Sequence, residues 1–290
     1  MHGLRNGAVS TIVNDWLING EPGQRIDATD RGFTYGDGLF ETIAVRDGKP
    51  RFFERHVARL LNGAGRLGIP APDTAALAAE AGQLAAGCGY GTLKIVLTRG
   101  TGRRGYVPPE PAVPLRCLGL LPGARPGPEI YARGIAVRHC ATPIGISPAT
   151  AGLKTLGRLE QVIARAEWRD ETIREGLMST PDGIVVCGTM SNLFLVVDGA
   201  LVVPDLSNCG IKGVMRSVVL DKADRLGFEW RFDDVPRESL AAADEIFVTN
   251  SLIGIWPISR IESREVMIGP VTRALMTALA DAGVEECAQC

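Results

Sequence analysis

Apolar and polar residues alternate in short segments along most of the chain, and turn signals separate these segments. Such alternation predicts β-strands joined by tight connections. Residues 40–45 are rich in β-forming types, and Asp47-Gly48 follows directly, which predicts a hairpin. Strands are expected at residues 11–19, 40–45, 91–98, 115–121, 134–141, 175–180, 183–188, 192–197, 200–203 and 244–251.

Other segments carry apolar residues three and four positions apart, which is typical of helices that bury one face. Helices are expected near residues 54–67, 73–87, 213–226 and 270–283, and in the segment that follows Lys154.

The predicted strands between residues 175 and 203 are too closely connected for helical crossovers. An antiparallel meander is therefore expected there.

The segment after Lys154 predicts a helix with Lys154 just before its start. Its apolar residues are Leu156, Leu159, Val162, Ile163 and Ala166. Their spacing predicts a buried face. The residues next to Lys154 include no carboxylate, so its amine is expected to have a lowered pKa and to be able to form a Schiff base. The alternative is a solvated lysine at a helix start.

A segment rich in proline and glycine, residues 122–128, is the clearest linker signal in the chain. It predicts an N-terminal domain over residues 1–121, a linker over 122–133 and a C-terminal domain over 134–290. A length of 290 residues allows either one large domain or two of ordinary size.

Composition and charge narrow the class of protein. Hydrophobic residues make up 46% of the chain and charged residues 22%, which indicates a globular protein. The formal net charge is −2 and no basic cluster occurs, so nucleic acid is not expected as a partner. We see no apolar segment of signal-peptide or membrane-spanning length, and we expect a soluble protein.

Seven cysteines are scattered along the chain, and an odd, scattered set suits a reducing cytoplasm. Only Cys287 and Cys290 have the two-residue spacing of a metal or redox motif. The chain has three histidines and no second cysteine pair, so we expect no structural zinc site and no metal.

A glycine pattern at residues 100–105 matches the dinucleotide-binding fingerprint and follows a predicted strand. That fingerprint requires a helix after the glycines, and the prolines of residues 107–114 prevent one. We therefore interpret the segment as a loop that presents Arg103, Arg104 and Tyr106 to a cleft, where an arginine can bind a substrate carboxylate.

Two further positions suit a phosphate group. Arg59 lies one helical turn from His56 and can act as a clamp, or it is simply solvated. Gly213 stands before a predicted helix, and the free amides at that helix start can hold a phosphate. The alternative there is an ordinary helix start.

Five motifs, in order, resemble the fold type IV pyridoxal-phosphate enzymes. This family includes branched-chain and D-amino-acid aminotransferases and aminodeoxychorismate lyases, and the loops at 98–106 and 152–161 are most similar to those of the lyases. The resemblance implies a two-domain α/β (α+β) fold with pyridoxal 5'-phosphate between the domains, and a homodimer that shares its active sites. The motifs are residues 31–41, 56–60, 153–161, 191–194 and 210–216.

The resemblance also implies roles for individual residues. Lys154 would carry the cofactor as a Schiff base. In the mechanism that we expect, the freed Lys154 amine acts as general base, and Lys154 or a nearby hydroxyl such as Thr42 protonates the departing enol. Arg104 and Tyr106 are the candidates for binding the substrate carboxylates. The remaining cofactor-binding positions would be Arg59, Cys187, Ser191, Asn192, Val214, Met215 and Ser251.

Cys187 departs from the family pattern. Family members usually have a glutamate five residues before the position of Asn192, where it keeps the pyridine nitrogen protonated. A thiol is mostly neutral and does not hold that proton, which weakens the electron sink that transamination needs. We therefore expect a lyase that converts 4-amino-4-deoxychorismate to 4-aminobenzoate and pyruvate. The alternatives are an aminotransferase for D-amino or branched-chain amino acids and a catalytically impaired cofactor-binding protein.

Overall fold

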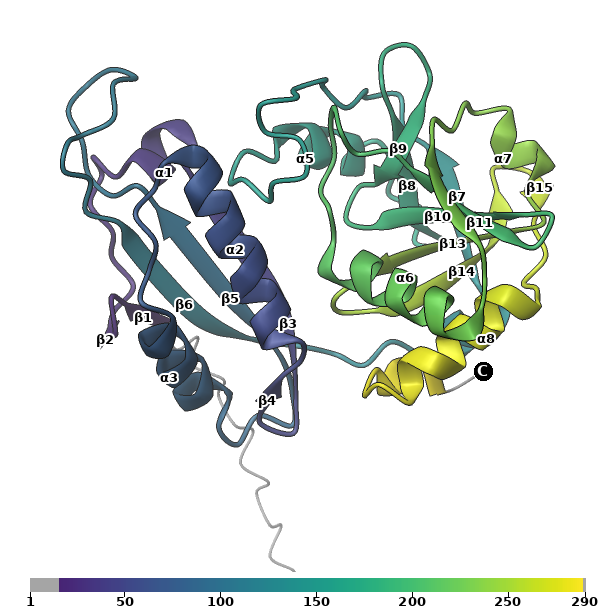
Figure 1. Cartoon of the computed structure of the whole chain (residues 1–290), viewed down its shortest axis with the longest axis horizontal. Helices are drawn as coiled ribbons and strands as arrows, with labels where there is room; N and C mark the ends of the chain where they lie inside the picture. Colours follow the sequence, from purple (N-terminus) through teal and green to yellow (C-terminus); the bar gives the residue numbers. More distant parts are fainter. Residues whose placement is uncertain (1–15, 289–290) are drawn as a thin grey trace, which may run out of the picture.

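The structure is a computed structural model that describes residues 16–288. It contains two β-sheets with helices packed on them, and the two halves lie side by side (Figure 1). This mixture of helices and sheets confirms the predicted fold class. The first five residues of the strand expected at 11–19, and Cys290, lie outside the described residues.

The first sheet has six antiparallel strands, and the helices α2 (Phe53–Leu67) and α3 (Thr74–Ala85) are packed against it (Figure 1). Its buried face is aliphatic, and Ile43, Leu60 and Leu93 are almost fully enclosed there. The strand order is β2 (Glu21–Pro22), β1 (Trp16–Ile18), β6 (Leu115–Pro122), β5 (Tyr90–Thr98), β3 (Gly38–Arg46) and β4 (Lys49–Pro50).

The predicted hairpin joins β3 to β4. Arg46 pairs with Lys49, and the two turn residues have positive φ angles, 47° at Asp47 and 76° at Gly48. Asp-Gly is the sequence that tolerates this geometry, which matches the right-handed twist of the strands. The hairpin prediction is confirmed.

The second sheet has nine strands, and the helices α6 (Val214–Leu226) and α8 (Pro270–Ala280) contribute buried residues to its core. Strands β8 to β11 form an antiparallel meander, as predicted. The strands are β7 (Ile135–His139), β8 (Ile173–Ser179), β9 (Val185–Gly188), β10 (Asn192–Val197), β11 (Ala200–Pro204), β12 (Trp230–Asp233), β13 (Glu245–Asn250), β14 (Gly254–Ile261) and β15 (Arg264–Glu265).

Four short helices and one 3-10 helix complete the described chain: α1 (Arg31–Tyr35), α4 (Pro128–Arg133), α5 (Leu159–Arg165), α7 (Ser239–Ala242) and the 3-10 helix Glu285–Ala288. The helix α4 lies within the predicted linker and contacts β14 of the second sheet. The two sheets lie on either side of this linker in the sequence, and we keep the domain boundaries 1–121, 122–133 and 134–290 as a proposal. Among residues 16–288, no helix has the length and hydropathy of a membrane span.

The helix α5 differs from the prediction. It covers only Leu159–Arg165, and its apolar side chains face outward: Leu159 is 76% exposed, Val162 62% and Ile163 56%. The expected burial of this face is therefore wrong for the single chain. The spacing of apolar residues predicts that a helix has an apolar face, but it does not identify what covers that face.

The glycine-rich segment between β5 and β6 contains no helix from residue 99 to 114. The expectation that the dinucleotide fingerprint lacks its helix is confirmed. Instead, the segment forms an irregular loop at one end of the first sheet.

Candidate functional site

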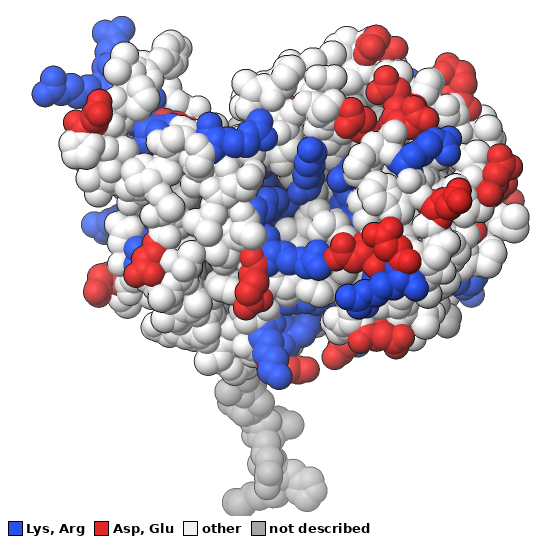
Figure 2. Space-filling view, viewed as in Figure 1, with Lys and Arg blue, Asp and Glu red and all other residues white. Residues whose placement is uncertain are grey.

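A pocket of about 310 Å³ brings together residues of both halves of the molecule. Lys and Arg side chains gather along the hollow between the halves, which favours anionic ligands (Figure 2). The predicted residues among its lining are Thr42, Arg59, Lys154, Cys187, Ser191, Asn192, Val214, Met215 and Ser251.

Backbone hydrogen bonds to the first sheet hold Lys154 in this pocket. The Phe40 amide donates to the Lys154 carbonyl at 3.0 Å, and the Leu156 amide donates to the Gly38 carbonyl at 3.0 Å. Lys154 therefore lies in an extended segment, five residues before α5, and not at the mouth of a helix as expected. Gly38 suits this close approach, because a Cβ there would lie 2.8 Å from Leu156 Cδ1 of this segment and 2.5 Å from the Leu97 carbonyl of β5.

The Lys154 amine is enclosed by apolar and cationic groups. Burial lowers the pKa of Lys154 to about 7, and the positive charge of Arg59 acts in the same direction. Its Nζ lies 4.2 Å from the centre of the Phe40 ring. A large fraction of this amine is therefore neutral near pH 7, which agrees with the expected nucleophile.

Arg59 is fixed by a carboxylate that the sequence analysis did not identify. Its Nε donates to Glu41 Oε1 at 2.8 Å, and His56 Nδ1 lies 2.6 Å from Glu41 Oε2. Burial alone would raise the pKa of Glu41, but hydrogen bonds from His56 and Arg59 outweigh it and lower that pKa. Burial lowers the pKa of His56, so the imidazole is neutral and donates through Nδ1. A glutamate in an apolar strand was the available signal for this cluster.

The start of α6 forms one end of the pocket. Gly213 occupies the cap position without a side-chain hydrogen bond to the helix, so no cap side chain accepts from the amides of Val214 and Met215. Asn192 Oδ1 accepts from the Gly213 amide at 3.1 Å, and Asn192 Nδ2 donates to the Ile211 carbonyl at 2.8 Å. Asn192 thus positions this helix start.

Ser251 lies in a turn that borders the same pocket. Asn250 Oδ1 accepts from the amides of Leu252 and Ile253, and the Ser251 carbonyl accepts from Arg51 at 2.8 Å. These bonds fix the turn from both sides. Ser251 lines the pocket, and its predicted part in holding a phosphate stays a prediction.

Cys187 lies on β9 and lines the pocket, and it is almost fully buried. Burial raises the pKa of this thiol well above its usual range, and the charge of Glu175 adds to the effect. Glu175 also accepts from Ser191 Oγ at 2.7 Å and from the Thr189 amide at 3.0 Å. The Cys187 thiol is therefore neutral, and the Ser191 hydroxyl is bound to a protein carboxylate.

The loop residues Arg104 and Tyr106 are not among the residues that line the pocket. Both side chains are exposed, with Tyr106 at 86%, and Arg31 holds the loop by donating to the carbonyls of Gly105 and Tyr106. Within one chain, the structure does not bring them to Lys154, and their role in substrate binding stays a prediction.

Two basic residues near Lys154 were missed in the sequence. Lys94 places its Nζ 3.8 Å from the centre of the Phe40 ring, and Arg158 lines the pocket directly. Lys94 reaches this place through the pairing of β5 with β3, where it lies opposite Thr42. Such cross-strand neighbours have no local sequence signal.

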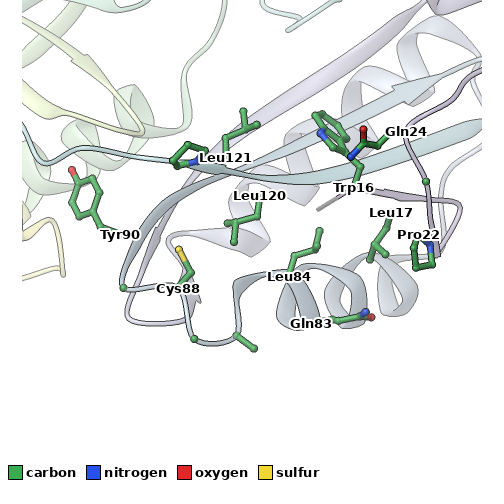
Figure 3. A pocket seen from close by; sticks show the side chains of 15 residues that line it. Trp16, Leu17, Pro22, Gln24, Gln83, Leu84, Cys88, Tyr90, Leu120 and Leu121 are labelled. Atoms are coloured by element: carbon green, nitrogen blue, oxygen red, sulfur yellow. The ribbon is translucent and has the colours of Figure 1, made fainter. Parts of the chain in front are cut away.

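A larger hollow of about 670 Å³ lies beside β1, α3 and β6 (Figure 3). It shares no lining residue with the Lys154 pocket. Its lining is mainly apolar, and Cys88 and Tyr90 are its titratable side chains. The chemistry is therefore placed in the smaller pocket.

Comparisons with known proteins agree with this geometry. The family profile of amino-transferase class IV matches residues 38–261. An aminodeoxychorismate lyase of Vibrio harveyi is 33% identical over 267 residues, which cover 89% of this chain and 97% of that protein. A solved structure of 4-amino-4-deoxychorismate lyase from Pseudomonas aeruginosa has a TM-score of 0.88 and 46% identity, over 92% of this chain and 98% of that chain.

More distant relatives have a different activity in their names. A D-alanine aminotransferase of Listeria innocua is 26% identical over 288 residues, which cover 97% of this chain and 98% of that protein. The branched-chain amino acid aminotransferase of Escherichia coli has a TM-score of 0.82 at 23% identity, over 94% of this chain and 95% of that chain, which shows a common fold.

Proposed function

Because the chain belongs to the amino-transferase class IV family, we propose that it is a pyridoxal-phosphate-dependent lyase that converts 4-amino-4-deoxychorismate to 4-aminobenzoate and pyruvate. Enzymes of this family and its lyases depend on pyridoxal phosphate. Two relatives with high coverage, from Vibrio harveyi and Pseudomonas aeruginosa, carry the name of this lyase.

The residues of the pocket fit pyridoxal phosphate. Lys154 offers an amine with a lowered pKa, and Arg59 together with the amides of Val214 and Met215 suits a phosphate. Gly213 is required at the helix start, because a Cβ there would lie 2.1 Å from Asn192 Oδ1. When bound, the cofactor supplies an electron sink next to the amino-bearing carbon of the substrate.

The observation that carries the lyase assignment is the neutral, buried thiol of Cys187. It cannot present a negative charge to the ring end of the pocket, because burial raises its pKa far above neutrality. Amino-group exchange depends on a strong electron sink, whereas an elimination that produces an aromatic ring has its own driving force. Cys187 therefore favours elimination.

Lys154 and Thr42 would handle the protons of this reaction. The Lys154 amine, with its pKa of about 7, removes the proton from the ring carbon that bears the nitrogen. The bond between the ring and the enolpyruvyl oxygen then breaks, and its electron pair stays on that oxygen. Thr42, which lines the same pocket, would pass a proton to the departing enol.

The direct test measures pyruvate and 4-aminobenzoate from 4-amino-4-deoxychorismate with purified protein and cofactor. We expect equimolar products. As a comparison, D-alanine or L-leucine is mixed with the protein, and the cofactor spectrum is followed. Rapid formation of pyridoxamine phosphate with no pyruvate from 4-amino-4-deoxychorismate would instead identify an aminotransferase.

We also propose a homodimer in which α5 contributes to the interface. Its exposed Leu159, Val162 and Ile163 form an apolar face next to the pocket-lining Arg158, and a second copy would remove this face from water. Among the described residues, Cys88, Cys117, Cys140, Cys187 and Cys209 are thiols outside any disulfide, which supports our proposal of a location in the reducing cytoplasm.

A further inference from the structure

Arg158 is a basic residue of the pocket without an assigned partner. Arg59, by contrast, already contacts Glu41 and donates to the Lys212 carbonyl at 3.2 Å. The Lys154 amine is reserved for the cofactor in the proposed function. Among these three pocket-lining cations, Arg158 is therefore the one whose charge the reaction scheme has not yet used.

The hydrogen bonds described for Arg158 do not join it to a carboxylate. One of its terminal nitrogens donates to Thr155 Oγ1 at 2.7 Å, while its buried Nε has no acceptor within residues 16–288. The described ion pairs do not include it. A guanidinium keeps its proton at working pH, so a partly buried one is stabilised by an anion.

Within residues 16–288, no carboxylate is paired with Arg158. Glu160 is the carboxylate that acts most on Arg158, but its Oε1 accepts from the Gly145 amide at 3.0 Å and makes no ion pair with Arg158. Burial lowers the pKa of Arg158, because the charged guanidinium loses hydration in this position. An anion supplied by a ligand would compensate for the lost hydration.

The position of Arg158 tells which part of a ligand it meets. It lines the Lys154 pocket and also an adjoining cavity of about 460 Å³ beside residues 144–147. Lys154 lines the same pocket, four residues earlier in the chain, so a ligand in this pocket meets both cationic side chains. A carboxylate on Arg158 would therefore belong to a substituent near the carbon that Lys154 deprotonates.

We propose that Arg158 binds the carboxylate of the enolpyruvyl substituent and thereby selects a dicarboxylate substrate; this inference rests on the proposed function. The enolpyruvyl group is attached to the carbon next to the reacting one, whereas the ring carboxylate lies on the opposite side of the ring. Arg158 would hold the substituent before and after its bond to the ring breaks. Residues other than Arg158 would bind the ring carboxylate.

The test compares Arg158→Gln and Arg158→Lys with Arg165→Gln. Arg165 is the last residue of α5, the helix that Arg158 precedes, but it donates to the Trp168 carbonyl and stacks on the Trp168 ring, and it does not line the pocket. Two probes are titrated into each holoenzyme: chorismate, which has both carboxylates, and 4-aminobenzoate, which has only the ring carboxylate. Binding is measured by calorimetry.

We expect the Kd for chorismate to rise about 30-fold in Arg158→Gln and less in Arg158→Lys, with the Kd for 4-aminobenzoate changed less than about twofold. Arg165→Gln should match the wild type. Equal weakening of both probes, or of neither, would overturn the inference. So would a loss confined to cofactor affinity, because Arg158 would then contact the cofactor.

The proposed function fails in a different way, since it predicts pyruvate release by the wild type. An active lyase whose Arg158→Gln variant binds chorismate normally contradicts only the role of Arg158.

Discussion

Glu41 and Arg59 form a buried ion pair next to Lys154, with Arg59 Nε donating to Glu41 Oε1 at 2.8 Å. The strand β3 supplies the carboxylate, and α2 supplies the guanidinium. This pair fixes a cation at the edge of the pocket while it leaves the arginine able to face an anionic ligand. The Lys154 amine experiences both charges, since Arg59 lowers its pKa and Glu41 raises it.

Replacing Glu41 by glutamine should destabilise the protein strongly. The change leaves Arg59 without its buried counter-charge, and removal of one partner of a buried pair costs about 3 kcal/mol. Urea denaturation would measure the free energy of unfolding. The matched control is Asp221→Asn, which breaks the exposed pair with Arg55 and should cost less than about 1 kcal/mol. Equal decreases in the free energy of unfolding of both variants would show that the pair of Glu41 and Arg59 stabilises the protein no more than the exposed pair does.

The rate of cofactor uptake by the apoprotein should rise with pH around a midpoint near 7. Only the neutral amine attacks the aldehyde, and the pKa of Lys154 is lowered from 10.5 to about 7, mainly by burial. Below that pH the amine is charged and uptake slows. Stopped-flow absorbance would record the profile, and a midpoint near 10 would contradict the lowered pKa.

Lys94→Met should move that midpoint upward. The positive charge of Lys94 is one of the causes that lower the pKa of Lys154, so its removal favours the protonated amine. The same uptake measurement applies. Lys222→Met serves as a control and should leave the midpoint unchanged, because Lys222 lies in the second half of α6 and does not line the pocket.

Cys187→Glu should increase amino-group exchange relative to elimination. A carboxylate at this position supplies the negative charge that the neutral thiol lacks. The measurement is the rate of pyridoxamine phosphate formation with D-alanine, compared with pyruvate release from 4-amino-4-deoxychorismate. Cys187→Gln has nearly the same size without the charge. If glutamate and glutamine behave alike, the charge at residue 187 does not decide the reaction.

Val162→Glu on α5 should produce a monomer at micromolar concentration. A buried, unpaired carboxylate at an interface strongly disfavours association. Light scattering after size-exclusion chromatography would give the mass. Met267→Glu changes an equally exposed apolar residue away from α5 and should remain dimeric. A wild-type protein that is already monomeric would rule out the proposed interface.

Local signals in the sequence predicted much of this molecule. The Asp47-Gly48 hairpin depends on two turn residues, and the helix start at Gly213 depends on one segment, so both can be inferred without the fold. Glu41 and Lys94 could not be placed beside Lys154, because sheet register and the packing of the two halves bring them there. The exposure of the apolar face of α5 could not be predicted either, because the spacing of apolar residues does not show that the described chain leaves this face uncovered.

Lys154 carries the cofactor in the proposed function. The most direct measurement is reduction of the cofactor-loaded protein with borohydride, followed by proteolysis and mass spectrometry of the labelled peptide. We predict loss of the absorbance of the bound cofactor and a single phosphopyridoxyl label on Lys154. A label on any other lysine, Lys94 included, or no label at all with cofactor bound, would contradict it.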